Sequence, residues 1–208
     1  MVKNTVKVDE LVRSGKLSSF SPIYLTCCRL GVKWLPYVNG CIYGPTPGIT
    51  ETLDVFLTCM EFDSMLDLFC GSGALSKLAY LRGVREIVAV DIYTESAVKN
   101  IGKISNIRVV RADALTFRNG CYDLLVADPP EKLIKTFIKN LSKISRMYKH
   151  VALIWLGPYS KVSRYRSFFT SKKNYKIIEV WGDAIMVTWK RNSKREVEKA
   201  LASVQQYI

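Results

Sequence analysis

The sequence is poor in the residues that metal, redox and membrane sites require. Its only histidine is His150, and none of its six cysteines forms a Cys-x-x-Cys pair. We therefore expect no metal site, and we interpret the cysteines as reduced thiols that pack like small apolar residues. No apolar run reaches the roughly 20 residues of a membrane helix, and the first ten residues lack the apolar core of a signal peptide. These absences predict a cytoplasmic protein that does not contact a membrane.

Two nucleotide-binding signatures are also missing. The sequence has no Gly-Lys-Ser/Thr, which excludes a P-loop. A Gly-x-Gly occurs at Gly71 and Gly73, but Ser76 stands where the dinucleotide fingerprint has its third glycine. The sequence therefore disfavours an oxidoreductase that binds a nicotinamide cofactor.

The positive charge of the chain is concentrated in its last third. The 208 residues carry a net charge of +13, yet residues 1–60 contribute only +2 and residues 61–130 contribute −1. Residues 131–208 hold 17 basic and 5 acidic residues, a net charge of +12. A one-sided basic surface suits a polyanion, most simply a nucleic acid, and the alternative is a solvated face that keeps the protein soluble.

Apolar runs and helical patterns alternate from Asp63 onward, which predicts parallel strands joined by right-handed crossovers. The expected strands are 64–69, 86–91, 107–111, 122–127, 150–156, 175–181 and 184–190. The expected helices are 3–14, 51–60 capped by Thr50, 73–82, 94–104, 131–148, 160–170 and 193–206, whereas residues 20–48 indicate strand and loop. Because Gly182-Asp183 is a short junction, the last two strands are expected to form an antiparallel hairpin.

Each of the first four strands of this alternating region has an aspartate within it or at its end. Asp67 lies inside the first, before the glycine turn, and Asp91, Asp113 and Asp128 follow the other three. The carboxyl ends of parallel strands share one edge of a sheet, so the pattern predicts a ligand site there. Asp91 has the position of a ribose-binding carboxylate or of a loop cap. Asp113 has the position of an adenine acceptor or of a helix N-cap.

The order of these motifs resembles the class I S-adenosylmethionine-dependent methyltransferases. Within that class it most resembles the bacterial enzymes that methylate the exocyclic N2 amine of guanine in small-subunit ribosomal RNA. The resemblance covers roughly residues 45–130 and is carried by Leu66 to Leu75, Arg82-Gly83, Val90-Asp91, Arg111 to Ala114, and Tyr122-Asp123 with Asp128-Pro129-Pro130. It implies an α/β, doubly wound, mostly parallel seven-stranded sheet with an antiparallel last hairpin, and S-adenosylmethionine as the cofactor. The first 44 residues resemble no family.

The resemblance also implies roles for individual residues. The glycine turn would surround the methionine part of the cofactor, Asp91 would hold the ribose, and Asp113 would face the adenine with Ala114 beside it. Ile92 would be a further cofactor-binding residue. The turn residues concerned are Asp67, Phe69, Cys70, Gly71 and Gly73. Glycine suits such a turn because it tolerates positive φ and lets a ligand approach the backbone closely.

Asp128, Pro129 and Pro130 resemble the (Asp/Asn)-Pro-Pro-aromatic motif of enzymes that methylate planar amines. A side-chain oxygen and a backbone carbonyl that accept the two amine hydrogens favour the developing positive charge, and proline fixes that carbonyl. The fourth position is Glu131 instead of an aromatic residue. Three readings follow: another aromatic stacks on the base, the acceptor is not a planar base, or no base is methylated. The candidate aromatics are Trp34, Tyr43, Trp155 and Tyr159.

Pyrimidine C5 methylation is disfavoured because it needs a nucleophilic cysteine. Cys121 begins its strand, far from the carboxyl edge, and Cys70 lies in the glycine turn. The basic residues after Pro130 predict contacts with RNA phosphates, and the aromatic residues among them suit unpaired bases. These basic residues are Lys132, Lys135, Lys139, Lys143, Arg146, Lys161, Arg164, Arg166, Lys172, Lys173 and Lys176.

The sequence therefore predicts an S-adenosylmethionine-dependent methyltransferase that acts on an exocyclic base amine in rRNA or tRNA, with guanine N2 favoured. The alternatives are methylation of a protein glutamine or a small molecule, and a catalytically silent RNA-binding protein with the same fold. We expect three segments: a dependent N-terminal extension or cap (1–48), a cofactor-binding domain (49–192) and a C-terminal helix (193–208).

Overall fold

The computed structural model describes residues 5–169 and 174–206, and its centre is a seven-stranded sheet in the order β6-β5-β4-β7-β8-β10-β9. The first five strands of that order are parallel, and β10 runs antiparallel to both of its neighbours. This arrangement confirms the predicted doubly wound sheet with its antiparallel last hairpin. The strands are β4 (Ser64–Leu68), β5 (Glu86–Asp91), β6 (Ile107–Arg111), β7 (Tyr122–Ala127), β8 (Tyr148–Pro158), β9 (Tyr175–Val180) and β10 (Asp183–Trp189).

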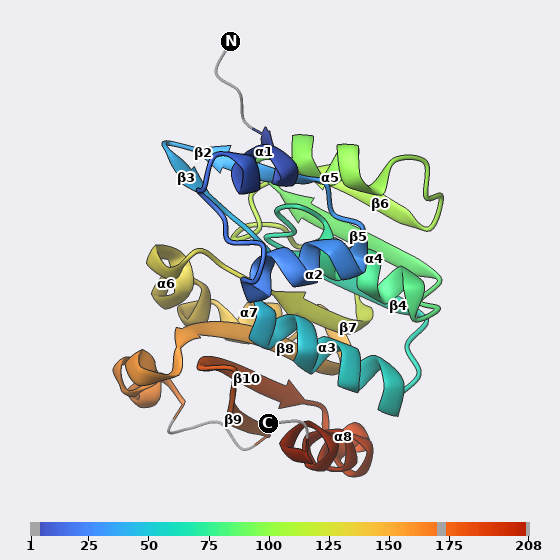
Figure 1. Ribbon diagram of the computed structural model, residues 1–208. Helices are drawn as coiled ribbons and strands as arrows, with labels where there is room; N and C mark the ends of the chain where they lie inside the picture. Colours follow the sequence, from blue (N-terminus) through green and yellow to red (C-terminus); the bar gives the residue numbers. More distant parts are fainter. Residues whose placement is uncertain (1–4, 170–173, 207–208) are drawn as a thin grey trace.

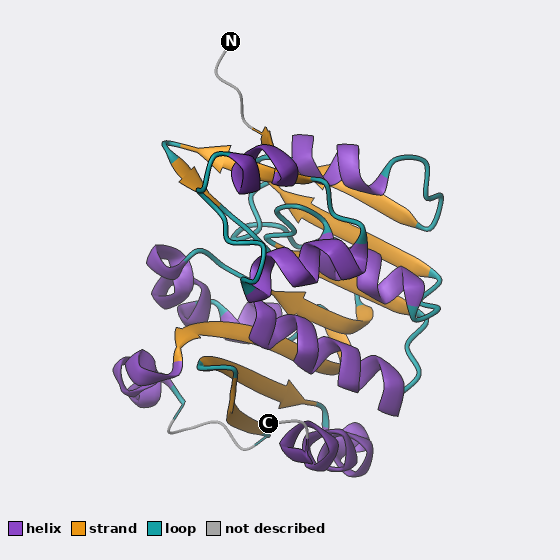
Figure 2. Ribbon diagram, in the orientation of Figure 1, coloured by secondary structure: helices purple, strands orange, loops and turns teal. Residues whose placement is uncertain are grey.

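Helices cover both faces of this sheet, so that the molecule has three layers (Figures 1 and 2). One face carries α3 (Pro47–Cys59), α4 (Ala74–Leu81), α5 (Glu95–Ile101) and α8 (Lys194–Gln206). The other face carries η1 (Glu131–Leu133), α6 (Ile134–Lys139), α7 (Leu141–Ile144) and η2 (Tyr159–Phe168). A last short turn, η3 (Arg191–Ser193), leads into α8.

The strands are apolar throughout because both of their faces are buried. Along β7, Leu124 and Val126 pack against the α3 and α4 side, whereas Leu125 and Ala127 pack against the α6 and α7 side. All four are fully buried. Continuous apolar strands are expected for parallel sheets that are covered by helices on both faces.

A second, three-stranded sheet lies within residues 5–42, where the sequence prediction was correct only in part. Thr5–Lys7 forms β1 and precedes α1 (Val8–Arg13), although the sequence predicted one helix over 3–14, of which residues 3 and 4 lie outside the described part. β1 pairs with β2 (Trp34–Val38), which pairs with β3 (Cys41–Ile42). β-Branched Thr5 and Val6 favour the strand over the predicted helix.

The prediction of only strand and loop over 20–48 was also wrong, because α2 (Pro22–Leu30) lies within it. Ser21 caps this helix by accepting a hydrogen bond from the Tyr24 amide at 3.2 Å, Pro22 occupies its first turn, and Gly31 ends it in the left-handed region. Serine, proline and glycine in that order are the usual start and stop signals of a helix. The start and end of α2 could therefore have been predicted from Ser21, Pro22 and Gly31 in the sequence.

Two other helices differ from prediction at identifiable side chains. Helix α3 begins at Pro47, so Thr50 lies inside it and donates to the Thr46 carbonyl at 2.7 Å instead of capping the helix. The predicted helix over 131–148 is broken at Asn140, whose side-chain amide donates to the Thr136 carbonyl at 3.0 Å. Asparagine competes in this way with the backbone pattern of a helix.

Three predicted boundaries shift for local reasons. Helix α5 ends at Ile101 because Gly102 follows with a positive φ. Strand β8 begins at Tyr148, which was predicted as the last residue of the preceding helix, two residues before the predicted start of the strand. Residues 159–168 form a 3₁₀ helix where an α-helix over 160–170 was expected; residue 170 lies outside the described part.

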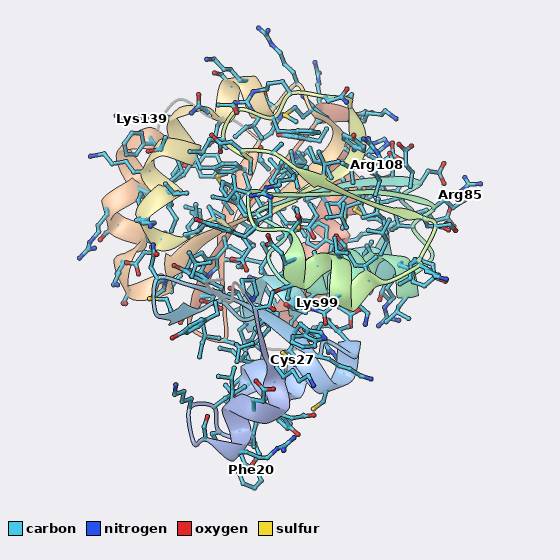
Figure 3. All side chains as sticks on the ribbon, turned by 90° about the horizontal axis from the view of Figure 1, so that it is seen from above. Phe20, Cys27, Arg85, Lys99, Arg108 and Lys139 are labelled. Atoms are coloured by element: carbon cyan, nitrogen blue, oxygen red, sulfur yellow. The ribbon has the colours of Figure 1, made fainter. Side chains whose placement is uncertain are left out.

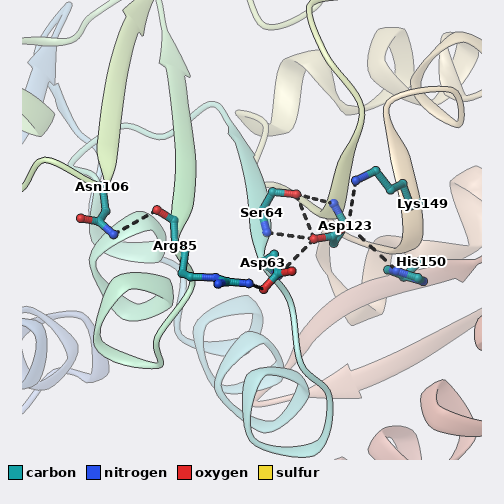
Figure 4. Close-up of polar contacts among 7 residues, drawn as sticks. All are labelled: Asp63, Ser64, Arg85, Asn106, Asp123, Lys149 and His150. Atoms are coloured by element: carbon teal, nitrogen blue, oxygen red, sulfur yellow. Dashed lines mark hydrogen bonds and ion pairs between the residues drawn. The ribbon is translucent and has the colours of Figure 1, made fainter.

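The amino ends of the strands are tied together by Asp123 at the start of β7 (Figure 4). Its Oδ2 accepts hydrogen bonds from the Asp63 and Ser64 amides at 3.0 Å, and its Oδ1 accepts one from Lys149 at 3.1 Å. Although partial burial raises the pKa of Asp123, the hydrogen bonds from Lys149 and Ser64 lower it below its usual value overall. These contacts hold together the amino ends of β4, β7 and β8.

The division into segments at residues 48 and 192 stays a prediction. Helix α3 starts two residues before the first boundary, and η3 crosses the second. Among the described residues, no helix is long and apolar enough to cross a membrane.

Candidate active site

A cavity of about 490 Å³ lies at the carboxyl edge of the central sheet. Its wall combines the strand ends of β4, β5, β6 and β7 with residues of the N-terminal sheet. The predicted site residues on the wall are Phe69, Cys70, Gly71, Asp91, Ile92, Asp113, Ala114, Asp128, Pro129 and Pro130. Asp67 and Gly73 are buried behind it. The structure thus brings the two predicted subsites, cofactor and acceptor, into one cavity.

The glycine turn after β4 is held in an unusual backbone conformation. Phe69, Gly71 and Gly73 have positive φ values of 63°, 51° and 77°. For Phe69 this conformation is strained, and the edge of its ring packs on Phe137 with 5.5 Å between the centroids. A Cβ on Gly73 would lie 2.9 Å from Cδ1 of Ile101, so glycine there permits close packing of α5. Gly71 lies on the cavity wall, and its positive φ favours glycine at this position.

Asp91 joins the end of β5 to this turn. Its Oδ2 accepts a hydrogen bond from the Gly71 amide at 3.0 Å, and its Oδ1 accepts one from the Tyr93 amide at 2.9 Å. Burial raises the pKa of Asp91, and these two amides oppose the shift. Each carboxylate oxygen has a further lone pair, so Asp91 caps its loop and still can accept two hydroxyl groups from the cavity.

Asp113 caps the turn that follows it, in place of the predicted helix, and its role as an adenine acceptor stays a prediction. Its Oδ1 accepts a hydrogen bond from the Leu115 amide at 2.9 Å, as an N-cap does, and the residue also lies on the cavity wall. Ala114 beside it is buried against the same cavity. Ile92 is 47% exposed and forms part of the outer wall.

Asp67 is fully buried, and its partner is the residue that replaced the third glycine. Ser76 donates a 2.6 Å hydrogen bond to Oδ2 of Asp67, whereas Oδ1 accepts none within the described residues. Burial raises the pKa of Asp67 to about 7, and the nearby charge of Asp91 adds to the shift. A buried carboxylate with one unmatched oxygen is unfavourable when ionised, so folding favours its protonated form.

We therefore expect Asp67→Asn to gain stability over the wild type as the pH rises from 5 to 7. The folded protein holds a proton on Asp67 that the unfolded chain, with an aspartate pKa near 3.9, has already lost, so wild-type stability falls with pH in this window. The difference should grow by about 1.4 kcal/mol per pH unit and level off above about pH 7. Urea unfolding at pH 5, 6, 7 and 8 measures it; a difference that does not change with pH would contradict the raised pKa.

The Asp128-Pro129-Pro130 segment follows β7 directly. The Asp128 amide donates to the Leu68 carbonyl at 3.3 Å, which fixes this segment beside the start of the glycine turn. Burial raises the pKa of Asp128 to about 7, the negative charges of Asp183 and Asp67 add to the shift, and hydrogen bonding from Thr46 opposes it. The carboxyl group therefore lies on the wall among other acids, with Pro129 and Pro130 beside it.

Glu131, at the position of the expected aromatic, forms an ion pair with Lys161 at 2.7 Å at the mouth of the cavity. Of the four aromatic residues proposed in its place, Trp155 and Tyr43 are on the wall. The Trp34 ring instead forms cation–π contacts: the Nζ atoms of Lys99 and Lys7 lie 4.1 and 5.2 Å from its centroid. Tyr159 lies on the surface, beyond the wall residues.

The N-terminal sheet and its flanking loops cover one side of the cavity. Pro36, Val38 and Asn39 there were not identified from the sequence, whereas Tyr43 was a candidate aromatic. Asn100 of α5 holds this sheet in place: its Oδ1 accepts from the Lys33 and Trp34 amides at 2.9 Å, and its Nδ2 donates to Trp34 and Ser72 carbonyls at 2.7 and 2.9 Å. Such contacts between distant segments leave no local sequence signal.

The basic face predicted after Pro130 is exposed along η1, α6 and α7, and Lys139 projects outward from it (Figure 3). Ile134, Phe137 and Ile138 of the same segment are buried, so the predicted partition of faces survives the break at Asn140. Lys172, Lys173 and the side chain of Arg166 lie outside the described residues.

Comparison with known proteins identifies the fold. No protein-family model and no curated protein sequence matches this chain. Among solved structures it is similar to ribosomal protein L11 methylase from Lactobacillus delbrueckii subsp. bulgaricus, with 15% identity, 71% of this chain and 81% of the other covered, and a TM-score of 0.57. A putative methyltransferase from Escherichia coli shares 21% identity, with 76% of this chain and 92% of the other covered, and a TM-score of 0.56.

A third structure is the 16S rRNA N2 G1207 methyltransferase (RsmC) of T. thermophilus in complex with AdoMet and guanosine. It shares 18% identity, with 74% of this chain and 49% of the other covered, and a TM-score of 0.55. The chain thus has the fold of the S-adenosylmethionine-dependent methyltransferases, which confirms the predicted fold class. The roles of individual site residues stay predictions.

Proposed function

We propose that the protein is an S-adenosylmethionine-dependent methyltransferase that acts on an exocyclic base amine in RNA, with guanine N2 favoured. The observation that carries the proposal is the single cavity in which Asp128, Pro129 and Pro130 face the glycine turn and Asp91. In the fold that this chain shares with methyltransferases, this edge holds a donor and an acceptor side by side. The solved structure with AdoMet and guanosine supports the same pairing.

The wall residues suit S-adenosylmethionine, which supplies an electrophilic methyl group on a sulfonium sulfur. Asp91 offers two oxygens for the ribose hydroxyls, Asp113 and Ala114 suit the adenine, and the turn at Gly71 admits a ligand close to the backbone. Asp128 would accept one hydrogen of the acceptor amine, which favours loss of its proton after the methyl group is transferred.

The proposal is tested by incubating the protein with tritiated S-adenosylmethionine and separate pools of rRNA, tRNA, DNA and protein. We expect label in an RNA pool and, after digestion to nucleosides, in a base methylated on its exocyclic nitrogen. Label in the protein pool alone would replace RNA with a protein amide as the acceptor. Absence of label from every pool, with cofactor bound, would support the catalytically silent alternative.

RNA binding should weaken steeply with salt, because basic residues release counterions from the phosphates they contact. Replacing Lys135, Lys139 and Lys143 together with alanine should reduce the slope of log affinity against log salt by about 2, at about 0.7 per phosphate contact on single strands. The matched control replaces Lys194, Arg195 and Lys199, three exposed cations of α8 on the opposite face. Filter binding at four salt concentrations measures the slope of log affinity against log salt for both triple variants. Equal slopes in the two variants would indicate that the α6–α7 face is a solvated surface that does not contact RNA.

A further inference from the structure

Trp155, near the end of β8, is held in a fixed orientation on the cavity wall. Its indole Nε1 donates a hydrogen bond to Oδ1 of Asp183 at 2.9 Å, and the side chain is half-buried. Trp155 and Asp128 line the same cavity and lie at the ends of neighbouring parallel strands. The ring also packs against the core on both sides of the sheet, and because its hydrogen bond lies at the ring edge, the part of the ring on the cavity wall can contact a ligand.

Asp183, the first residue of β10, joins this tryptophan to a third element. Its Oδ2 accepts a hydrogen bond from the Gly48 amide in the first turn of α3 at 3.1 Å. A Cβ on Gly48 would lie 2.5 Å from the Val180 carbonyl oxygen and 2.6 Å from Cβ of Asp183, so only glycine allows α3 to approach so closely. Both carboxylate oxygens of Asp183 are thus engaged in fixing their neighbours.

The same short segment of chain also reaches Asp128. Thr46, two residues before Gly48, lies on the cavity wall with Asp128 and opposes the rise in the pKa of Asp128. Residues 46–48 therefore run from the Asp128 side of the cavity to the Trp155–Asp183 pair. An aromatic surface and a hydrogen-bond acceptor thus line one cavity, as a site for a flat ring that carries an amine requires.

We propose that Trp155 supplies the aromatic surface on which the acceptor base stacks, in place of the residue that Glu131 replaces, and that Asp183 is its positioning residue. This inference rests on the proposed function. Glu131 is engaged with Lys161 at the cavity mouth and offers no ring. Tyr43, the other aromatic candidate on the wall, is 38% exposed on the N-terminal segment, whereas Trp155 is anchored in the central sheet beside Asp128.

Trp155→Ala should lower kcat/KM for the labelled RNA pool roughly tenfold to a hundredfold, the usual range for loss of one base–aromatic stack. Trp155→Phe should retain most of the activity, because phenylalanine keeps an aromatic face. Asp183→Ala should raise KM, and Asp183→Asn should raise it less, since its one amide oxygen can still accept from the indole although its NH2 group cannot accept from the Gly48 amide. Trp181→Ala is the matched control: Trp181 is 65% exposed, lies in the β9–β10 turn and is absent from the wall.

A binding measurement separates this inference from the proposed function. Guanosine 5′-monophosphate is titrated into protein saturated with S-adenosylhomocysteine while tryptophan emission is recorded, and we expect quenching that Trp155→Phe removes and Trp181→Phe retains. RNA methylation that is unchanged in Trp155→Ala would overturn the stacking role alone. Quenching that depends on Trp155, in a protein that labels no RNA, would support the stacking role and overturn methyl transfer alone.

Discussion

Replacing Asp128 with alanine is expected to lower kcat for methyl transfer by about a hundredfold to a thousandfold, the range seen when one preorganised transition-state contact is removed. The amine that attacks the methyl group gains positive charge as the bond forms, and Asp128 is the carboxylate on the wall beside Pro129 and Pro130 that can accept its hydrogen. Cofactor affinity should stay within a few-fold of the wild type, because the contacts of Asp91 with the glycine turn are untouched.

Asparagine at this position gives a sharper test than alanine. Asp128→Asn keeps a side-chain oxygen that accepts a hydrogen bond, so it should retain far more activity than Asp128→Ala. Asp123→Asn is the matched control, since it changes an aspartate at the opposite end of the same strand. Equal turnover in Asp128→Ala and wild type would remove Asp128 from the mechanism.

The pH dependence provides a second, independent readout for Asp128. Burial among other acids raises its pKa to about 7, and the ionised form accepts a hydrogen bond from the positively charged amine more strongly than the neutral acid does. We expect kcat to fall below pH 7 toward the level of Asp128→Asn and to level off above pH 7. Asp128→Asn should lose this dependence, because an amide does not titrate. A pH profile shared by both proteins would assign the ionisation to another group.

The sequence predicts the central sheet well because local pattern and tertiary environment agree there. Strands such as Glu86–Asp91 and Tyr122–Ala127 occur at their predicted positions, since an apolar run bounded by turns fits a strand covered on both faces. The glycine turn and its acids follow from the same order, because strand ends must share an edge. Prediction failed where one side chain decided the outcome, as at Asn140, which ends α6.

The parts of the site that could not be predicted depend on contacts between distant segments. Nothing near Asn100 in the sequence indicates that it bonds to Trp34 and Ser72, and nothing near Asp183 indicates Trp155 or Gly48. Ser76 shows the same effect. In the sequence, Ser76 occupies the position of the third glycine of the dinucleotide fingerprint. In the structure, it donates a hydrogen bond to the buried carboxyl group of Asp67.

Asp91→Ala is expected to weaken S-adenosylhomocysteine binding by roughly a hundredfold. A hydrogen bond to a charged acceptor contributes about 1.5–3 kcal/mol, and Asp91 is positioned to accept both ribose hydroxyls. The substitution would also free the Gly71 amide, whose 3.0 Å hydrogen bond to Asp91 stabilises the turn on the cavity wall. Asp91→Asn, which keeps one carbonyl oxygen, should lose about tenfold, near the lower limit for one such bond.

Isothermal titration calorimetry with S-adenosylhomocysteine measures this loss, and the Asp123→Asn protein serves as the control for general effects of removing a carboxylate. Affinity for S-adenosylhomocysteine should decrease most in Asp91→Ala and less in Asp113→Asn. Asp113 lies on the cavity wall, but its Oδ1 already accepts a hydrogen bond from the Leu115 amide. Unchanged affinity in Asp91→Ala, or tight binding of NADH to the wild type, would overturn the cofactor assignment. The cavity would then have to be interpreted from its acceptor side alone, starting from Asp128 and Trp155.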